Sequence, residues 1–459
     1  MRRVAGSSPA ALAVATVACA AILVATTAQT ASAATWARTY GGTLADDEAR
    51  AVQQTSDGGY VVAGLTRSFG AGLADAWVLK LGVSGNVQWE RSYGGTGDDD
   101  AQGIHQTSDG GYVFAGRTNS FGQGGPGDFW VVKLDSSGGI LWQRTYGGTC
   151  IDEAHAVQQT SDGGYVVAGN TCSFGFAPSG DAWVVKLDSS GGLVWESTYG
   201  FTSTFETATS IQELAGGGYI VAGYTDVNNP PSNPPPADND FWVFALDAAG
   251  FIQWQWTAGG FVAGLSGDSA HAVHQTSDGG YVIAGTTTLG AGSWDFWIIK
   301  LNGSGTIQWQ KTYGFPLSLE SAQAVRQTAD GGYVVTGYRL IGSTYDLIVI
   351  KLDASGNMQW EKSYNAGGQN LANAVRQTSD GGYVVAGFTD ALGSGNRDLW
   401  VLKLDPVGGL GYGCALQGSL SGSLAASAVG TLLTNAFPFT GSMGVIVANT
   451  AVTAPATTA

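Results

Sequence analysis

The chain has 459 residues, of which only 12% are charged, 11% are aromatic and 71 are glycines. This composition is typical of an all-β protein with tight turns. The net charge is −16, or −18 without Arg2 and Arg3, so we expect no binding to the phosphates of nucleic acid and none to anionic membrane surfaces.

The first 33 residues predict an export signal. Two arginines form a positive end, an apolar stretch follows over about 10–25, and residues 31–33 read Ala-Ser-Ala, the small-residue pattern of a cleavage site. The alternative is a membrane anchor, but the apolar core is short and rich in alanine. We therefore expect a mature chain from Ala34 that is secreted, either free or associated with the cell surface, and that has no membrane span.

One phrase, QTSDGGYVVAG, recurs along the chain. Seven copies spaced by 50–62 residues predict a repeat protein. The copies, of which the fourth diverges to ELAGGGYIVAG, stand at 54–64, 106–116, 159–169, 213–223, 275–285, 327–337 and 377–387.

Each period predicts four short strands. In the first period AVQQT (51–55) and YVVAG (60–64) flank the turn SDGG, and Asp-Gly is a strong hairpin signal because both residues tolerate a positive φ. DAWVLKL (75–81) and VQWERSY (87–93) complete the set. Four such strands form one sheet of the size of a propeller blade. Seven periods therefore predict an all-β, seven-bladed β-propeller over residues 34–406.

A tryptophan marks the fourth strand of each period and indicates how the ring closes. No such strand follows the last WVLKLD segment (400–405), but TWARTY (35–40) precedes the first hairpin. We expect this N-terminal segment to complete the last blade beside 399–404. The repeated Trp and Tyr rings are expected between neighbouring blades rather than as sugar-stacking platforms. The tryptophans are Trp36, Trp89, Trp142, Trp195, Trp254, Trp309 and Trp360.

These repeats carry a family resemblance. KLDSSGGILW (133–142) and ALDAAGFIQW (245–254) resemble the tryptophan-docking repeat of quinoprotein-like propellers. The whole unit DGGYVVAG…DFWVVKLDSSG…W…YGG looks like a group of secreted bacterial and archaeal propeller-repeat proteins. The resemblance covers about residues 35–406 and implies the fold; most such proteins are uncharacterised, and some are labelled lipoprotein or endoglucanase. A quinoprotein dehydrogenase needs an adjacent Cys-Cys pair, which this sequence lacks, so we expect no cofactor.

Two acidic series repeat once per blade. They could be calcium ligands or hydrogen-bonded loop residues, and we favour the second interpretation because calcium-binding turns repeat at nine residues and not at about 53. No metal site is therefore expected. The first series is Asp75, Asp128, Asp181, Asp240, Asp295, Asp346 and Asp398, and the second is Asp47, Asp99, Asp152, Glu206, Asp268, Glu320 and Asn370.

Function is expected where the blades differ. A polar, variable residue precedes the small residue of each inner strand, on the face predicted to carry the crossover loops. This ring could line the channel mouth and bind a ligand, or it could be an ordinary solvated rim. Its members are Arg50, Gln102, His155, Thr209, His271, Gln323 and Asn373.

Three further features depart from the repeat. Cys150 and Cys172 lie on the same face of the third blade, which in an exported protein predicts a disulfide. The loop 226–240 carries five of the 12 prolines and is either a contact arm or a tolerated insertion. The uncharged tail, 407–459, is a disordered segment, part of a small β-domain or an attachment segment.

The sequence favours a secreted, monomeric, non-catalytic module that binds a polysaccharide or a protein. The alternative is an endoglucanase-like glycoside hydrolase, which needs two carboxylates about 5–10 Å apart across a cleft. Almost all acidic residues belong to the repeated series, so no catalytic pair is distinguished by sequence.

Overall fold

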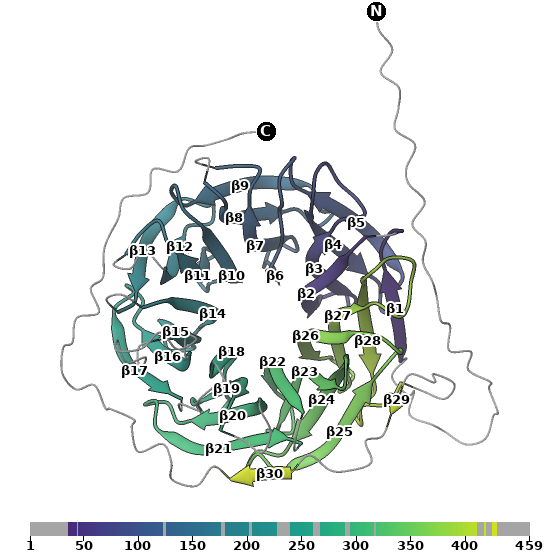
Figure 1. The fold of residues 1–459 in the computed structure, drawn as a ribbon. Coiled ribbons are helices and arrows are strands. Elements are labelled where there is room, and N and C mark those ends of the chain that lie inside the picture. Colours follow the sequence, from purple (N-terminus) through teal and green to yellow (C-terminus); the bar gives the residue numbers. More distant parts are fainter. Residues whose placement is uncertain are drawn as a thin grey trace, which may run out of the picture.

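The computed structural model of the protein describes residues 35–43, 45–122, 125–175, 180–201, 204–226, 239–259, 267–289, 294–315 and 318–410, and the backbone of 417–418 and 425–428. The expected export signal, most of the proline-rich loop and most of the tail lie outside these residues. The described chain forms seven antiparallel sheets arranged as blades around a central channel, which confirms the seven-bladed β-propeller (Figure 1).

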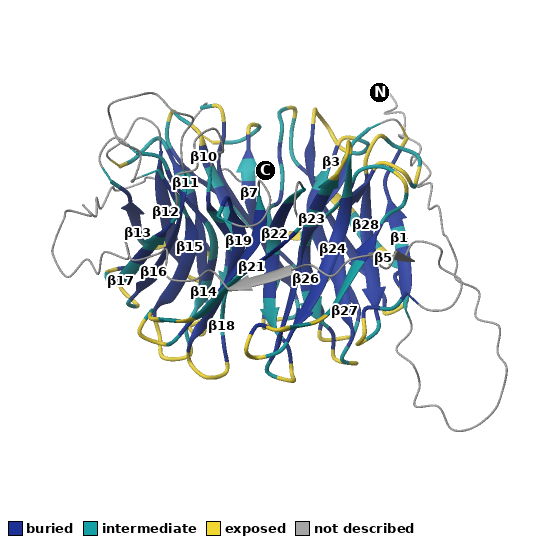
Figure 2. Ribbon diagram, turned by 60° about the horizontal axis from the view of Figure 1, so that its bottom comes forward, coloured by how far each residue is buried: buried dark blue, intermediate teal, exposed yellow. Residues whose placement is uncertain are grey.

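The first blade runs outward from the channel through β2 (Asp47–Gln54), β3 (Tyr60–Thr66), β4 (Asp75–Leu81) and β5 (Val87–Tyr93). Its third and fourth strands have the predicted bounds. The inner strand begins four residues earlier than predicted, because the crossover residue Asp47 already pairs with Thr66. The third strand is buried along its whole length in every blade except the sixth, where the first two residues of the strand are partly exposed. Figure 2 shows that the exposed residues gather in the turns at the two faces of the ring.

Blades two to six repeat this order. They comprise β6 (Gly103–Gln106), β7 (Tyr112–Thr118), β8 (Asp128–Leu134) and β9 (Ile140–Tyr146); β10 (Asp152–Gln159), β11 (Tyr165–Thr171), β12 (Asp181–Leu187) and β13 (Leu193–Tyr199); β14 (Glu206–Glu213), β15 (Tyr219–Thr225), β16 (Asp240–Leu246) and β17 (Ile252–Ala258); β18 (Ser269–Gln275), β19 (Tyr281–Thr287), β20 (Asp295–Leu301) and β21 (Ile307–Gly314); and β22 (Leu319–Gln327), β23 (Tyr333–Ile341), β24 (Thr344–Leu352) and β25 (Met358–Tyr364).

The seventh blade joins the two ends of the propeller. It contains β26 (Asn370–Gln377), β27 (Tyr383–Thr389) and β28 (Asp398–Leu404), and its outer strand is β1 (Trp36–Tyr40). β1 lies antiparallel to β28, with Tyr40 opposite Leu399. Figure 1 shows β1 beside β28 at the outer edge of this blade. The predicted closure by the N-terminal strand is therefore confirmed, and it leaves no unpaired edge at the join.

The fourth-strand tryptophans dock onto the neighbouring blade. Trp89 donates its indole N–H to the carbonyl oxygen of Ser136 (3.1 Å) and lies so close to Gly138 that a side chain there would meet its ring. Its ring also packs edge-on against Tyr112, at 5.7 Å between centroids. The same Trp–Gly contact occurs at all seven blade junctions, so the aromatic series lies between blades as expected. The glycines are Gly85, Gly138, Gly191, Gly250, Gly305, Gly356 and Gly408.

The inner hairpin differs from the predicted Asp-Gly turn. The Gly58 N–H donates to the Thr55 carbonyl oxygen (2.9 Å), so Ser56 and Asp57 are the central residues, and Gly58 follows with φ 81°. Asp57 instead serves as an acceptor. Its carboxylate binds the Gly59 N–H (3.0 Å) and the buried Lys80 ammonium (2.8 Å).

The divergent fourth copy lacks this ion pair altogether. Gly216 stands where the other blades have the turn aspartate, and Ala245 stands where they have the buried lysine. The two partners are therefore replaced together, which avoids leaving a buried charge without its counter-ion.

The glutamine that opens the repeated phrase links the blades in a closed circle. Gln106 accepts a hydrogen bond from the Ser56 N–H of the preceding blade (2.8 Å), and at the join Gln54 accepts one from Ser379 (2.8 Å). In blade four the divergent Glu213 makes the equivalent bond to Ser161 (2.7 Å). The repetition of the phrase thus reflects its role in assembling the ring.

Two short pieces of the C-terminal tail extend existing blades. β29 (Gln417–Gly418) pairs with β25, and β30 (Ala425–Ala428) pairs with β21, on the outer side of blades six and five (Figure 1). These two pieces therefore add to propeller sheets and do not pair with each other.

Candidate functional site

The innermost strands of the seven blades surround a central channel of about 300 Å³. All seven residues of the ring singled out from sequence line it, and we call this set the mouth ring. The structure thus brings together residues that are up to 323 positions apart, from Arg50 to Asn373.

A β-bulge presents the mouth-ring residues to the channel. In the first blade the pairing of β2 with β3 shifts between Ala49 and Ala51, so that Arg50 is the extra residue. A bulge places two successive side chains on one side of the strand, and both Arg50 and Ala51 line the channel. The same shift occurs at His155, Thr209, His271, Gln323 and Asn373.

Three mouth-ring side chains link adjacent blades. Thr209 donates to the carbonyl oxygen of Ala270 (2.8 Å), and Asn373 donates to that of Ala49 (2.7 Å). His271 Nδ1 lies 2.7 Å from the carbonyl oxygen of Ala322, so Nδ1 carries the proton and Nε2 is an acceptor in the neutral ring. Burial lowers the pKa of His271 and favours that neutral form.

The other four mouth-ring residues are held by polar groups of their own blade. Their partners leave a mixed set of donors and acceptors around the mouth. The pairs are Arg50 with Glu48 (2.8 Å), Gln102 with Asp100 (3.1 Å), His155 with Asn170 (2.9 Å) and Gln323 with Ser321 (2.7 Å).

A second polar ring lies three residues further along each inner strand. We call it the inner ring, and all its members line the channel: Gln53, His105, Gln158, Gln212, His274, Arg326 and Arg376. Sequence reasoning missed it, because simple alternation from Arg50 would turn residue 52 inward and residue 53 outward. The bulge reverses that alternation, and only the structure shows it. The one signal in the sequence was that the residue type at this position varies from blade to blade.

The two acidic series meet at the blade junctions. A side chain on Gly94 would contact both Asp75 and Asp99, which lie in successive blades. Both accept backbone hydrogen bonds, Asp75 from Ala71 (2.9 Å) and Asp99 from Gly95 (2.8 Å), as expected for loop-fixing residues. Within the described ranges, no group of three or more His, Cys, Asp or Glu residues could hold a metal ion.

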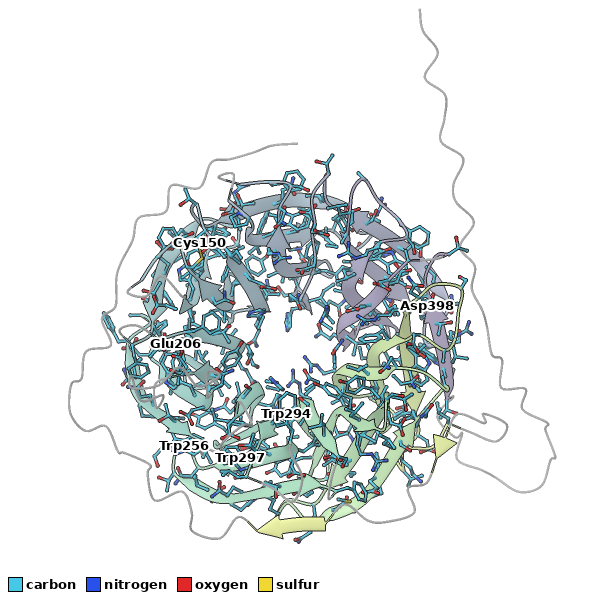
Figure 3. The ribbon with its side chains drawn as sticks, in the orientation of Figure 1. Cys150, Glu206, Trp256, Trp294, Trp297 and Asp398 are labelled. Atoms are coloured by element: carbon cyan, nitrogen blue, oxygen red, sulfur yellow. A yellow bond between two sulfur atoms is a disulfide. The ribbon has the colours of Figure 1, made fainter. Side chains whose placement is uncertain are left out.

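Several of these junction carboxyls have strongly raised pKa values. Burial, together with repulsion from the neighbouring Asp181 carboxylate, raises the pKa of Glu206 to about 7. Burial and the neighbouring Asp47 raise that of Asp398 to about 6. Figure 3 shows Glu206 and Asp398 on opposite sides of the ring.

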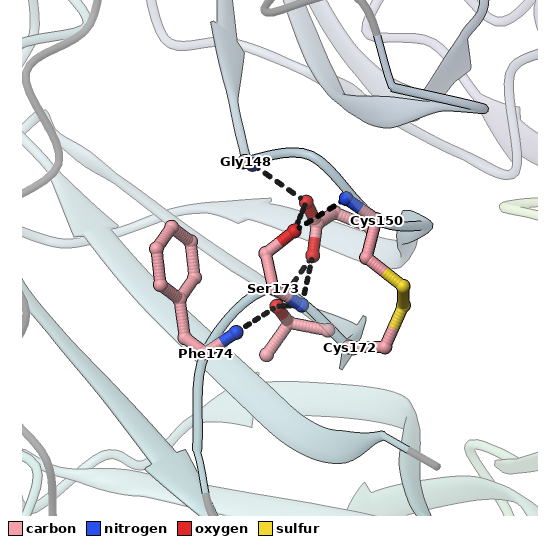
Figure 4. The surroundings of a disulfide bond; sticks show 7 residues. Gly148, Cys150, Cys172, Ser173 and Phe174 are labelled. Carbon is pink, nitrogen blue, oxygen red and sulfur yellow. Dashed lines mark hydrogen bonds between the residues drawn. A yellow bond between two sulfur atoms is a disulfide. The ribbon is translucent and has the colours of Figure 1, made fainter. Parts of the chain in front are cut away.

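A disulfide joins Cys150 and Cys172, as predicted (Figure 4). It connects the crossover into the third blade with the loop after β11. The adjacent Ser173 hydroxyl accepts from the Cys150 N–H (3.1 Å) and donates to Asp152 (2.7 Å), so the bridge reinforces a loop that is already hydrogen-bonded.

No protein-family model matches the sequence, and no curated protein matches it. Among solved structures the chain is similar to the Pan2 WD40 domain of Neurospora crassa (12% identity, 77% of this chain and 88% of that chain, TM-score 0.45). It is also similar to Sqt1 of Chaetomium thermophilum (12%, 82% and 97%, TM-score 0.42) and to a Bacteroides caccae protein of unknown function (11%, 65% and 92%, TM-score 0.37). Likenesses at this level carry no information on activity or partners. No helix in the described part of the chain is long and apolar enough to cross a membrane.

Proposed function

We propose that the protein is a secreted, non-catalytic binding module that takes a polysaccharide chain or a protein segment at the mouth ring. The observation that carries this proposal is the set of bulges, which turn non-repeated polar side chains into the channel of a closed ring. Residues held on rigid strands bind a ligand with little ordering cost. The Cys150–Cys172 disulfide and the expected export signal support an extracellular location.

The glycoside hydrolase alternative has less support. The junction carboxyls Glu206 and Glu320 have pKa values of about 7, as a general acid requires, but both side chains are buried between blades (0% and 2% exposed). A catalytic carboxyl must contact the scissile glycosidic bond, and a polymer cannot reach these two.

A binding screen of the mature protein on polysaccharides, run with a reducing-sugar assay, tests the proposal. We expect binding without sugar release, and we expect the double change Arg50→Ala and Gln323→Ala to weaken it. Arg50 suits this test because its partner Glu48 also binds Arg397, so Glu48 keeps an ion pair. Arg67→Ala, outside the channel, is the matched control.

Sugar release that disappears when one carboxylate is changed would overturn the proposal in favour of the hydrolase. Binding that is equally strong in the double variant would place the ligand elsewhere on the ring. If no polysaccharide binds, pull-down of extracellular proteins with the wild type and the double variant tests whether the ligand is a protein.

A further inference from the structure

The inner ring contains a cluster of basic side chains. His274, Arg326 and Arg376 come from the three adjacent inner strands β18, β22 and β26, and His105 comes from β6. All four occupy the same position in their blades, three residues after the mouth-ring residue, so they lie at one level of the channel. In the remaining blades this position is a glutamine.

The two arginines of this cluster have no acidic partner. Arg50 pairs with Glu48 and Lys80 pairs with Asp57, but within the described residues neither Arg326 nor Arg376 forms an ion pair. Arg326 Nη1 donates to the carbonyl oxygen of its own neighbour Val325 (2.7 Å), and Arg376 does the same to Val375 (3.2 Å). Since a guanidinium has five N–H donors, this bond engages only part of each group.

Burial is the main cause of the lowered pKa values in this cluster, and repulsion from Arg376 adds to it for Arg326, His105 and His274. Burial, and then the neighbouring Arg376, lowers the pKa of Arg326, and burial lowers that of Arg376 to about 10. Burial and these two arginines lower the pKa of His274 to about 3, and burial and Arg376 lower that of His105 to about 4. A chain of net charge −16 therefore concentrates uncompensated positive charge in its channel, where the reduced dielectric strengthens repulsion.

We propose that the inner ring is an anion site that binds a tetrahedral oxyanion, phosphate or sulfate, either as the free ion or as the end group of a larger ligand. Two guanidinium groups match the charge and the paired oxygens of such an ion. The neutral imidazoles of His105 and His274 add N–H donors without further positive charge. This site goes beyond the proposed function, because it uses different residues and stands even if the mouth ring binds nothing.

The ring itself supplies the variants for a test. Gln53, Gln158 and Gln212 occupy the same position in other blades, and each accepts a backbone N–H from the next blade at 2.7–2.9 Å. The double change Arg326→Gln and Arg376→Gln should therefore fold. Arg144→Gln is the matched control, because Arg144 lies on the outer strand β9 and also donates Nη1 to its neighbour's carbonyl oxygen (2.9 Å).

Isothermal titration and thermal melting of the mature protein, with phosphate, sulfate and chloride at constant ionic strength, provide the measurement. We expect one phosphate or sulfate per chain and a higher Tm, with binding weakened about tenfold or more in the double variant. Arg144→Gln should bind as the wild type does. Without phosphate, the double variant should melt at the wild-type temperature or above it, because it removes two like charges.

Titration of glucose 6-phosphate against glucose distinguishes the two sources of the anion. Binding of the ester shows that the site accepts an end group, and binding of inorganic phosphate alone shows a site for the free ion. The proposal is overturned if neither phosphate nor sulfate binds saturably, if chloride competes equally, or if the double variant keeps the wild-type affinity. None of these results depends on whether a mouth-ring ligand is found.

Discussion

Replacing Glu206 with glutamine should make the stability of the propeller less dependent on pH. Glu206 is fully buried at the junction of blades three and four, where its carboxyl accepts a hydrogen bond from Thr225 (2.9 Å) and approaches Asp181. Burial and this second carboxylate raise its pKa from 4.5 to about 7. That difference corresponds to about 3 kcal/mol between the protonated and ionised forms.

The sign follows from which state has the higher pKa. Because the folded-state pKa is raised, the protonated carboxyl favours the fold, and this contribution is complete below about pH 4.5 and is lost as the pH rises through 7. The Glu206→Gln variant cannot ionise. Its free energy of unfolding, relative to the wild type, should therefore rise by about 3 kcal/mol between pH 4.5 and pH 8.

Blade seven shows that an amide fits such a junction. Asn370 stands in the place of the acid, and its Oδ1 accepts from Thr389 (2.8 Å) in the way that Glu206 accepts from Thr225. Urea unfolding of wild type and variant at pH 5 and pH 8, followed by tryptophan fluorescence, measures the effect. Asn370 Nδ2 donates to the carbonyl oxygen of Tyr345 (3.3 Å), which precedes Asp346 in the chain. The reciprocal change Asn370→Asp should therefore introduce a loss of stability as the pH rises. An equal stability difference at both pH values would refute the reasoning.

Three further predictions concern the ring. Asp57→Asn leaves the buried Lys80 without its carboxylate and should lower the unfolding free energy by about 1–2 kcal/mol. The double change Asp57→Gly with Lys80→Ala reproduces the blade-four arrangement, and in urea unfolding it should lower the unfolding free energy by less than the sum of the two single changes. Simple additivity of the two losses would contradict this coupling. Changing both Cys150 and Cys172 to serine removes a bridge between residues 22 positions apart and should cost about 3 kcal/mol, so an unchanged Tm would disprove the stabilising role. Trp36→Ala removes the contact of β1 with Gly85 across the join and should cost about 3 kcal/mol; limited proteolysis at the N-terminus should accelerate, and unchanged proteolysis would argue against closure by β1.

Much of the fold was predictable because repetition magnifies weak signals. One DGGY hairpin predicts little, but seven aligned copies define four strands per blade, and the unmatched Trp36 strand indicates the closure that β1 and β28 make. The mouth ring was also predictable, because each of its residues differs between blades and directly precedes the small residue of the inner strand. The inner ring was not, because the bulge at Arg50 changes which side of the strand every later residue faces.

The amino-acid sequence was enough to predict the seven blades, the closing strand, the disulfide partners and the burial of the repeated aromatic rings. Each of these follows from a pattern local to one repeat or from a count of repeats. The surroundings of the non-repeated residues could be known only from the folded ring. It placed Arg326 and Arg376 together in the channel without a carboxylate, and it placed Asp181 against Glu206 between two blades. The physical reason is that charge compensation depends on the distances between side chains of different blades. These side chains are about 50 positions apart in sequence, and the sequence does not specify the distances between them.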